Sequence, residues 1–441
     1  MSDIVAPTAL SIEETDALFQ KIGWRILPLL LLAYVSAFLD RVNVGFAALQ
    51  MNSHLGFTPL VFGTGAGLFF LGYVLLEVPS NLILAKVGAR VWLARIMISW
   101  GLVSAATGFI AGRHGFYAVR ILLGAVEAGF YPGLMFYLTL WFPRKYRARI
   151  FSLTTIAVPI SSVIGSPLSS LILTAMNGWL GLDGWRWVFL IEGAPAVIIG
   201  LLIAMLLPSD PTRASFLTPT ERNIVATLIA GERREREHRQ RFSVGDAMRD
   251  RRVLLMCLVS VGIVIGTTGA AIWMPLFVKS FGFSTLETGF VAAIPALFTV
   301  GAVLFCGWNA DRTGRPVAHV VVPFLCSACG FLLTASVHSP LLGLLGLAIG
   351  VAGISSAVPS FWTLPTELLT GTASAAGIAL INSVGSIGGF VGPYLIGWIR
   401  TQTGGFSGSL VFLAAVMTMA ACTVVVVSML MQGGSRRDIG R

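Results

Sequence analysis

Charged residues are scarce in this chain of 441 residues. Asp, Glu, Lys and Arg make up 11% of it, whereas 56% is hydrophobic. Soluble domains carry about 25% charged residues. So little charge could not cover the core of a soluble protein of this length, so lipid must surround much of the chain. A helix crosses ~30 Å of hydrocarbon in about 20 residues, and the hydrophobic runs predict an all-α integral membrane protein with twelve transmembrane helices. The predicted spans are 24–46, 58–84, 91–111, 115–140, 150–177, 186–207, 253–278, 287–308, 317–337, 341–363, 374–399 and 408–431.

Motifs for enzymatic chemistry are also missing from the sequence. There is no P-loop, no metal-ligand spacing and no nucleophile with an adjacent base. The five cysteines lie in apolar stretches without the basic neighbours that generate a thiolate. We therefore expect no enzymatic activity, no cofactor and no metal, and an ion gradient as the source of energy.

Basic residues are abundant on only one side of the predicted topology. The formal net charge is +10, and 24 of the 30 Lys and Arg residues fall in the tails and in alternate loops. The opposite side receives four: Arg113, Arg186, Lys279 and Arg400. The positive-inside rule then places both termini in the cytoplasm of a bacterial inner membrane. The basicity thus indicates topology rather than nucleic-acid binding, and we expect a monomer in the lipid bilayer.

A long polar segment divides the hydrophobic runs into two groups of six. The predicted organisation is a cytoplasmic N-terminal tail (1–22), a first six-helix bundle (23–207), a cytoplasmic linker (208–252), a second bundle (253–431) and a C-terminal tail (432–441). Within the linker, Thr218-Pro-Thr-Glu221 is typical of a helix start.

Intramembrane charges are few and lie almost entirely in the first bundle. Because a charge at mid-bilayer costs about 2.5–3.5 kcal/mol on insertion scales, such residues are functional candidates. Asp40 and Arg41 point about 100° apart and must find partners on other helices, whereas Arg120 and Glu127 share one helix face. We expect protonation of Glu127 to release Arg120, or to strengthen the field of Arg41, so that a substrate carboxylate can bind. The alternative is a purely structural quartet. The remaining candidates are Glu77 and Glu192, interpreted as capping or gating groups, and Glu367.

Neutral polar residues supply the other candidate contacts. Asn382 can donate and accept hydrogen bonds toward a hydroxylated substrate, or it can join two helices. Tyr73 and Trp362 can line a cavity at the midplane or serve in packing.

A short motif occurs once in each half. Gly307, Asp311, Arg312, Gly314 and Arg315 fall between the eighth and ninth spans, and the corresponding loop of the first half has Ala85, Lys86, Gly88 and Arg90. In both loops a basic residue is followed by Gly and then Arg, which predicts a tight cytoplasmic turn that needs Gly.

The second copy of this motif resembles the loop signature of the major facilitator superfamily, whose members form two pseudo-symmetric six-helix bundles. The first copy departs from it, with Ala85 where the family usually has Asp. The segments 39–47, 69–81, 120–129, 141–143 and 184–193 look more specifically like the anion:cation symporter family. That resemblance implies that Arg41 binds the substrate carboxylate and that Asp40 and Glu127 couple protons.

The sequence therefore predicts a proton-coupled symporter that imports a small organic anion, such as a sugar acid, a dicarboxylate like tartrate or an aromatic carboxylate. Two alternatives stay open: a proton-independent exchanger or facilitator of organic anions, and a transporter-like membrane sensor that signals through the linker.

Overall fold

The computed structural model describes residues 11–237, 250–368 and 372–438, and within these ranges the regular secondary structure is helical. Parts of both predicted tails and of the linker, and the side chain of Glu367, lie outside the described residues. The first bundle consists of α1 (Ile12–His54), α2 (Pro59–Val87), α3 (Ala89–Thr107), α4 (Arg113–Glu127), α5 (Phe130–Trp141), α6 (Arg144–Ala175) and α7 (Gly184–Leu206). The second consists of α10 (Arg251–Lys279), α11 (Thr285–Thr313), α12 (Ala318–Ser336), α13 (Pro340–Leu368), α14 (Thr372–Gly385), α15 (Ile387–Thr403) and α16 (Ser407–Asp438).

Eleven helices in the described part of the chain are long and apolar enough to cross a membrane. They correspond to eleven of the predicted spans, with α4 and α5 counted together and α14 and α15 counted together. The remaining span, 91–111, corresponds to α3. Arg90 and Arg95 lower the hydropathy of this 19-residue helix. It packs extensively against α7, so the bundle accommodates it as a full member.

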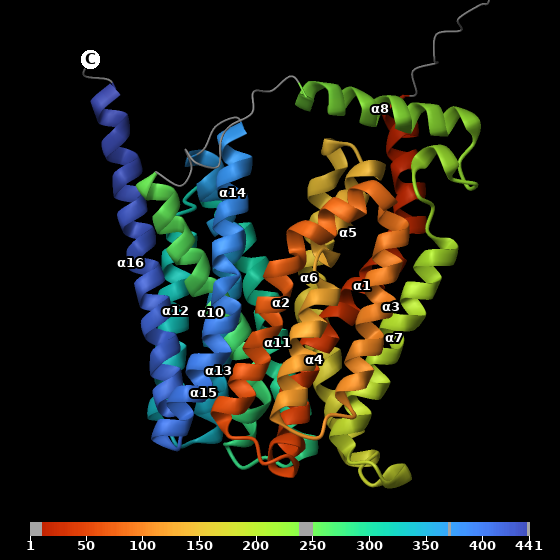
Figure 1. Ribbon diagram of the computed structural model, residues 1–441. Coiled ribbons are helices and arrows are strands. Elements are labelled where there is room, and N and C mark those ends of the chain that lie inside the picture. The colour runs from red at the N-terminus through yellow and green to blue at the C-terminus, as the bar shows by residue number, and fades with distance from the viewer. Residues whose placement is uncertain (1–10, 238–249, 369–371, 439–441) are drawn as a thin grey trace, which may run out of the picture.

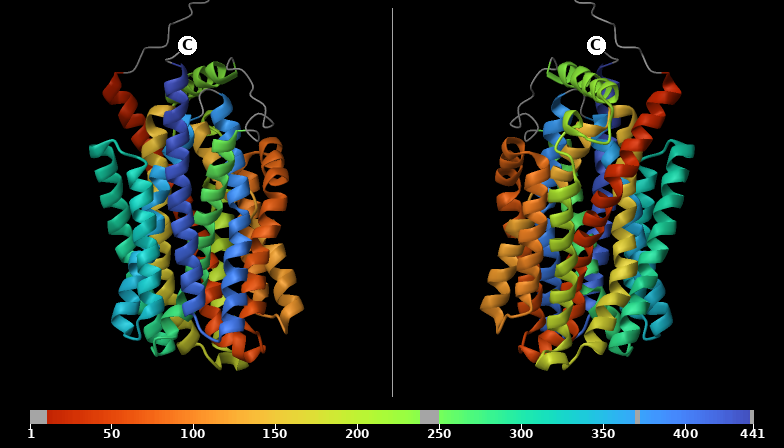
Figure 2. Two further views of the ribbon diagram at one scale, coloured as in Figure 1. Left: turned by 90° about the vertical axis from the view of Figure 1, so that its left-hand side faces the viewer. Right: turned by 90° about the vertical axis from the view of Figure 1, so that its right-hand side faces the viewer.

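The segments that flank the bundles gather at one end of the molecule, here called the terminal end; the opposite end is the distal end (Figure 1). The start of α1, the end of α16 and the linker helix α8 (Pro219–Glu237) all lie at the terminal end, and α8 runs across it in both views of Figure 2. The predicted helix start is confirmed, because the backbone N–H of Thr218 donates to Glu221 Oε2 at 2.8 Å. Residues 12–22, predicted as tail, extend the first helix.

Two acidic residues hold the linker helix against the first bundle. Arg147 Nη2 lies 2.8 Å from Glu232 Oε2, and the backbone N–H of Arg144 donates to Glu232 Oε1 at 2.7 Å. Lys21 Nζ lies 2.9 Å from Glu221 Oε1. Part of the predicted linker is thus a docked helix.

Each bundle contains one span that is interrupted beside the bundle interface. The span predicted over 115–140 ends as α4 at Glu127, turns at Gly129 with φ +87° and resumes as α5. A Cβ at Gly129 would lie 2.5 Å from Ser80 Oγ, so both conformation and space require glycine. In the second bundle α14 gives way to α15 at Ser386. Sequence periodicity predicted neither interruption.

Glycines let the two bundles meet closely in their distal halves. A Cβ on Gly45 of α1 would lie 2.3 Å from the carbonyl oxygen of Ile272 on α10. A Cβ on Gly63 of α2 would lie 2.3 Å from the carbonyl oxygen of Pro393 on α15. These backbones touch without intervening side chains, so the distal end is closed between the bundles.

The repeated loop motif forms the predicted tight turns. Gly314 ends α11 with φ +61°, and Gly88 ends α2 with φ +97°. Arg312 lies over the ring of Trp308, with 5.6 Å from its guanidinium carbon to the ring centroid. Asp311 forms no ion pair with any residue that the structure describes, so the role of this motif as a cytoplasmic gate stays a prediction.

Candidate transport site

A central cavity of about 190 Å³ lies between the two bundles. Three of the predicted substrate-binding residues line it: Arg41 from α1, Tyr73 from α2 and Asn382 from α14. The other lining residues are Tyr34, Ala37, Phe38, Phe69, Phe70, Glu77, Phe130, Tyr131, Val264 and Ser386. Arg120 and Trp362 do not line it. The wall is therefore mainly aromatic, with one cation, one carboxyl group and a few neutral polar groups.

Arg41 is bound to Glu127 at the wall of this cavity. Its Nε donates to Glu127 Oε1 at 2.8 Å, and its Nη2 donates to the same oxygen. The Glu127 side chain is fully buried, whereas that of Arg41 is 28% exposed. The guanidinium also lies over the rings of Phe38, at 5.0 Å from carbon to centroid, and Tyr73, at 5.7 Å. Only Arg41 in this pair can meet a solute.

Close packing of α2 against α4 brings Glu127 to this position. A Cβ on Gly124 would lie 1.9 Å from the carbonyl oxygen of Phe69, so the two backbones are in contact there. The helix then ends directly after Glu127, which leaves this carboxyl group at a helix terminus beside α1. Discontinuous helices of this kind are typical of binding sites in transporters.

Arg120 occupies a different environment from the one its spacing predicts. It is only 2% exposed, its Nη2 lies 3.5 Å from the carbonyl oxygen of Ala66, and its guanidinium carbon lies 5.0 Å from the ring centroid of Phe69. The shared helix face suggested that Arg120 reaches Glu127, but within the described residues the hydrogen-bond partner of Glu127 is Arg41, through Oε1. Arg120 Nε and Glu127 Oε2 both lack hydrogen-bond partners among the described residues. Arg120 nevertheless interacts electrostatically with Asp40 and Glu127.

Asp40 lies away from the central cavity and is 2% exposed. Trp100 Nε1 donates to its Oδ2 at 2.6 Å, Asn43 Nδ2 donates to its Oδ1 at 2.9 Å, and Ser104 Oγ also donates to Oδ1. As the sequence indicated, Asp40 and Arg41 do not pair with each other and both find partners on other helices. The donors on α3 were not predicted, although Trp100 and Ser104 are four residues apart and share a helix face.

The other candidate side chains divide between the cavity and the packed interior. Glu77 lines the cavity, whereas Glu192 is 3% exposed and accepts a hydrogen bond from Ser169 Oγ at 2.6 Å. That bond joins α7 to α6. The side chain of Asn382 is exposed and forms no hydrogen bond within the described part of the chain, which leaves its amide open to the cavity. Trp362 packs against Phe361.

No group of three or more His, Cys, Asp or Glu residues that could hold a metal ion occurs within the described ranges. The arrangement that is present can exchange one carboxylate for another at Arg41, because a guanidinium binds any carboxylate through the same planar edge.

Several known proteins are similar to this chain over most of its length. Two proteins of Agrobacterium vitis named "Putative tartrate transporter" are each 46% identical over 409 residues, which cover 93% of this chain and 91% or 94% of theirs. The "Putative metabolite transport protein NicT" of Pseudomonas putida is 40% identical over 413 residues, covering 93% of this chain and 94% of its own.

A solved structure shares the fold at low sequence identity. A bacterial homologue of the human lysosomal transporter Spinster, in an inward-facing and unoccupied conformation, superposes with a TM-score of 0.75 at 18% identity, covering 95% of this chain and 98% of that one. The family model for the Major Facilitator Superfamily matches residues 30–393. Sequence, helix arrangement and relatives agree, and the chain belongs to the Major Facilitator Superfamily of membrane transporters.

Proposed function

We propose that this protein is a proton-coupled symporter that imports a small organic anion through a bacterial inner membrane. The observation that carries the proposal is the Arg41–Glu127 ion pair at the wall of the central cavity. Proteins of similar sequence named as tartrate transporters support a carboxylate as the substrate class. The charge distribution supports a cytoplasmic terminal end, so that the closed distal end faces the periplasm.

Proton binding and substrate binding are linked through Arg41. While Glu127 is ionised, its carboxylate occupies the guanidinium. When Glu127 takes up a proton it becomes a poor partner for Arg41, which is then free to bind a solute carboxylate in the cavity. Tyr73 and Asn382 lie on the same cavity and offer a hydroxyl and an amide to the remaining polar groups of the solute.

Asp40 and Arg120 act behind the cavity wall rather than on the solute in this proposal. Asp40 is a second proton site, held by donors from α3, and Arg120 supplies the second positive charge, so that together with Arg41 it balances the two carboxylates. Contact between Arg120 and the substrate, predicted from sequence, is replaced by this compensating role because Arg120 does not line the cavity.

Proteoliposomes provide the test, with tartrate as the first probe. We expect an imposed pH gradient to drive accumulation in wild-type protein, and Glu127→Gln to abolish accumulation but to retain counterflow. Glu192→Gln is the matched control, since Glu192 is equally buried and lies away from the cavity lining. Accumulation that ignores the pH gradient, or survives in Glu127→Gln, would refute proton coupling and favour an exchanger or facilitator.

The second alternative function is a transporter-like membrane sensor that signals through the linker. Because α8 docks on the first bundle, the linker could transmit a bound state to a partner. Uptake that survives replacement of residues 219–237 by a flexible linker would contradict that role.

A further inference from the structure

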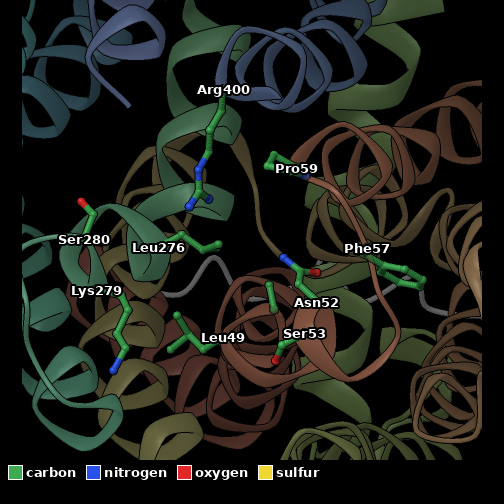
Figure 3. Close-up of a pocket in the computed structure, with 10 residues that line it drawn as sticks. Leu49, Asn52, Ser53, Phe57, Pro59, Leu276, Lys279, Ser280 and Arg400 are labelled. Carbon is green, nitrogen blue, oxygen red and sulfur yellow. The ribbon is translucent and has the colours of Figure 1, made fainter. Parts of the chain in front are cut away.

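A second cavity, here called the distal cavity, lies between the bundles on the distal side of the glycine contacts and has a volume of about 380 Å³ (Figure 3). Both bundles contribute to it, through the end of α1 and start of α2 on one side and the ends of α10 and α15 on the other. The lining residues are Ala48, Leu49, Asn52, Ser53, Phe57, Pro59, Leu276, Lys279, Ser280 and Arg400. None of these residues lines the central cavity.

Arg400 is held on an aromatic surface with its donors directed into the distal cavity. Its guanidinium carbon lies 3.9 Å from the ring centroid of Phe406 and 5.8 Å from that of Trp273. Stacking of this kind fixes the plane of the guanidinium and leaves its edge for hydrogen bonds. In Figure 3 the side chains of Arg400 and Asn52 point toward one another across the cavity. No carboxylate of the described residues pairs with Arg400 or bonds to Lys279.

Acidic groups at the distal end are few and already engaged. Asp183 Oδ2 lies 3.0 Å from His54 Nδ1 and 3.6 Å from Arg186 Nε. Glu287 accepts the backbone N–H of Ser284 at 2.8 Å within its own helix and interacts electrostatically with Lys279. Only four basic residues fall on this side of the topology, and two of them line this one cavity. The distal cavity is therefore a positively charged recess on an otherwise weakly charged face.

The recess suits a small carboxylate. Arg400 and Lys279 supply the charge, Asn52, Ser53 and Ser280 supply hydrogen bonds to hydroxyl groups, and the volume exceeds that of a compact dicarboxylate. The contact of Gly45 with Ile272 lies between the distal and central cavities along α1 and α10, and it closes the route between them in this conformation. A solute bound here is on the distal side of the closed gate, beside the seam along which the bundles must part.

We propose that the distal cavity is a capture site, where the organic anion binds weakly on the periplasmic side before the bundles open. The proposal rests on the proposed function for the identity of the anion and for the orientation. Its physical basis is that charge at the mouth of a pathway raises the local concentration and association rate of an oppositely charged solute.

Transport kinetics from the two sides of the membrane test the site. In right-side-out vesicles we expect Arg400→Gln and Lys279→Gln each to raise the KM for tartrate at least about threefold, which is the effect of removing one unit charge at ~6 Å in water from a single carboxylate of the solute. Arg400→Lys, which keeps the charge, is the matched control. In inside-out vesicles the KM should stay at the wild-type value, because solute there reaches the central cavity first. An unchanged KM in right-side-out vesicles, or an equal increase on both sides, would overturn the proposal.

Chemical labelling tests the field of the cavity without requiring transport. Ser53→Cys places a thiol on an exposed lining position, and the parent chain with its five native cysteines gives the background. The measured quantity is the rate of modification by an anionic methanethiosulfonate reagent divided by the rate with a cationic one. We expect this ratio to be higher for the thiol at position 53 than for a free thiol in solution. Addition of Arg400→Gln should lower that ratio about tenfold, because the anionic reagent slows about threefold and the cationic one accelerates about threefold, and tartrate should protect.

The two tests separate the failure of this proposal from that of the proposed function. Charge preference and protection without proton-driven uptake would leave the distal cavity as an anion site and remove the symporter. Uptake by wild-type protein, combined with absence of any charge preference at position 53, would remove the capture site and leave the symporter.

Discussion

Gly45→Ala should open the contact between the bundles at the distal end. The substitution adds volume at a point where the two bundles touch in this closed conformation and separate when the distal end opens. The new Cβ would lie 2.3 Å from the carbonyl oxygen of Ile272, whereas ordinary contacts of a Cβ are 3.4 Å or longer. The obstacle is backbone, so rotation of a side chain cannot relieve it. Overpacking of this kind costs about 1–3 kcal/mol.

This free-energy cost applies only to the conformation with the distal end closed. It therefore shifts the population toward the conformation with the distal end open. Because every 1.4 kcal/mol is about tenfold in an equilibrium constant, Gly45→Ala should disfavour the closed distal end by roughly 5-fold to 150-fold relative to the open one. The free energy of unfolding from the open state should change little, since that state does not contain the contact.

Labelling from the periplasmic side measures this shift. We expect Ala48→Cys, which is 2% exposed and lines the distal cavity, to react at least fivefold faster when Gly45→Ala is present. Gly301→Ala is the control for a helical glycine with open space, where no atom lies within 4 Å of the added Cβ. Gly124→Ala is the control for a clash inside one bundle, which should lower stability without changing access. Equal labelling rates in Gly45→Ala and Gly301→Ala would refute the reasoning.

Three further predictions concern single interactions. Trp100→Phe removes a donor to Asp40 at a buried position, and thermal unfolding should show a loss of about 1–3 kcal/mol, whereas Trp24→Phe at an exposed position should not. Gly129→Ala forces φ +87° on a residue with a Cβ that meets Ser80, and we expect a loss of roughly 1–3 kcal/mol, with reduced accumulation of tartrate because Glu127 moves. Burial raises the pKa of Glu221, but the bonds from Thr218 and Lys21 outweigh it and hold the pKa below its ordinary value. The docking of α8 should therefore be complete above the ordinary Glu pKa of about 4.3 and weaken as the pH falls below it, which proteolysis of the linker between pH 3 and pH 6 would detect.

The architecture was predictable from sequence because membrane insertion depends on local properties. Hydrophobic length, the placement of Lys and Arg, and a polar linker are all readable in short windows. Helix α8 was predicted for the same reason, since Thr218 and Glu221 form a capping pair within one turn. The first loop motif has Ala85 where an acidic residue is usual, so the sequence did not show which group accepts a hydrogen bond from Arg90. In the structure Arg90 Nε donates to the carbonyl oxygen of Ala204 at 3.0 Å.

The partners of the buried charges were only half predictable. The 100° step between Asp40 and Arg41 follows from helix geometry, and it correctly separated the two side chains. The choice between Arg120 and Arg41 as the partner of Glu127 depends on how far α1 lies from α4 and on the interruption after Glu127. Those quantities arise from packing between helices, which no periodicity within one helix records.

The distal cavity was beyond sequence reasoning for a related reason. Asn52, Lys279 and Arg400 belong to three helices, and each is more than a hundred residues from the next in the sequence. The count of basic residues in the loops identified Lys279 and Arg400 only as exceptions to the positive-inside rule. The three residues line one cavity because the ends of α1, α10 and α15 lie close together in the fold. Basic residues are few on this side of the protein, so the placement of both Lys279 and Arg400 in one cavity points to an anion site.

In the proposed cycle, one guanidinium and one carboxylate stay together at the centre of the membrane throughout. Glu127 pairs with Arg41 in the empty carrier. In the loaded carrier the carboxylate of the solute pairs with Arg41, while Glu127 holds the proton. A guanidinium that is enclosed between the bundles without a partner would cost several kcal/mol, so the bundles should reorient only when Arg41 is paired. Glu127→Gln removes the internal partner and leaves the empty carrier with an uncompensated charge. Such a carrier can return only with solute bound, which is why counterflow should persist in this variant while net accumulation stops.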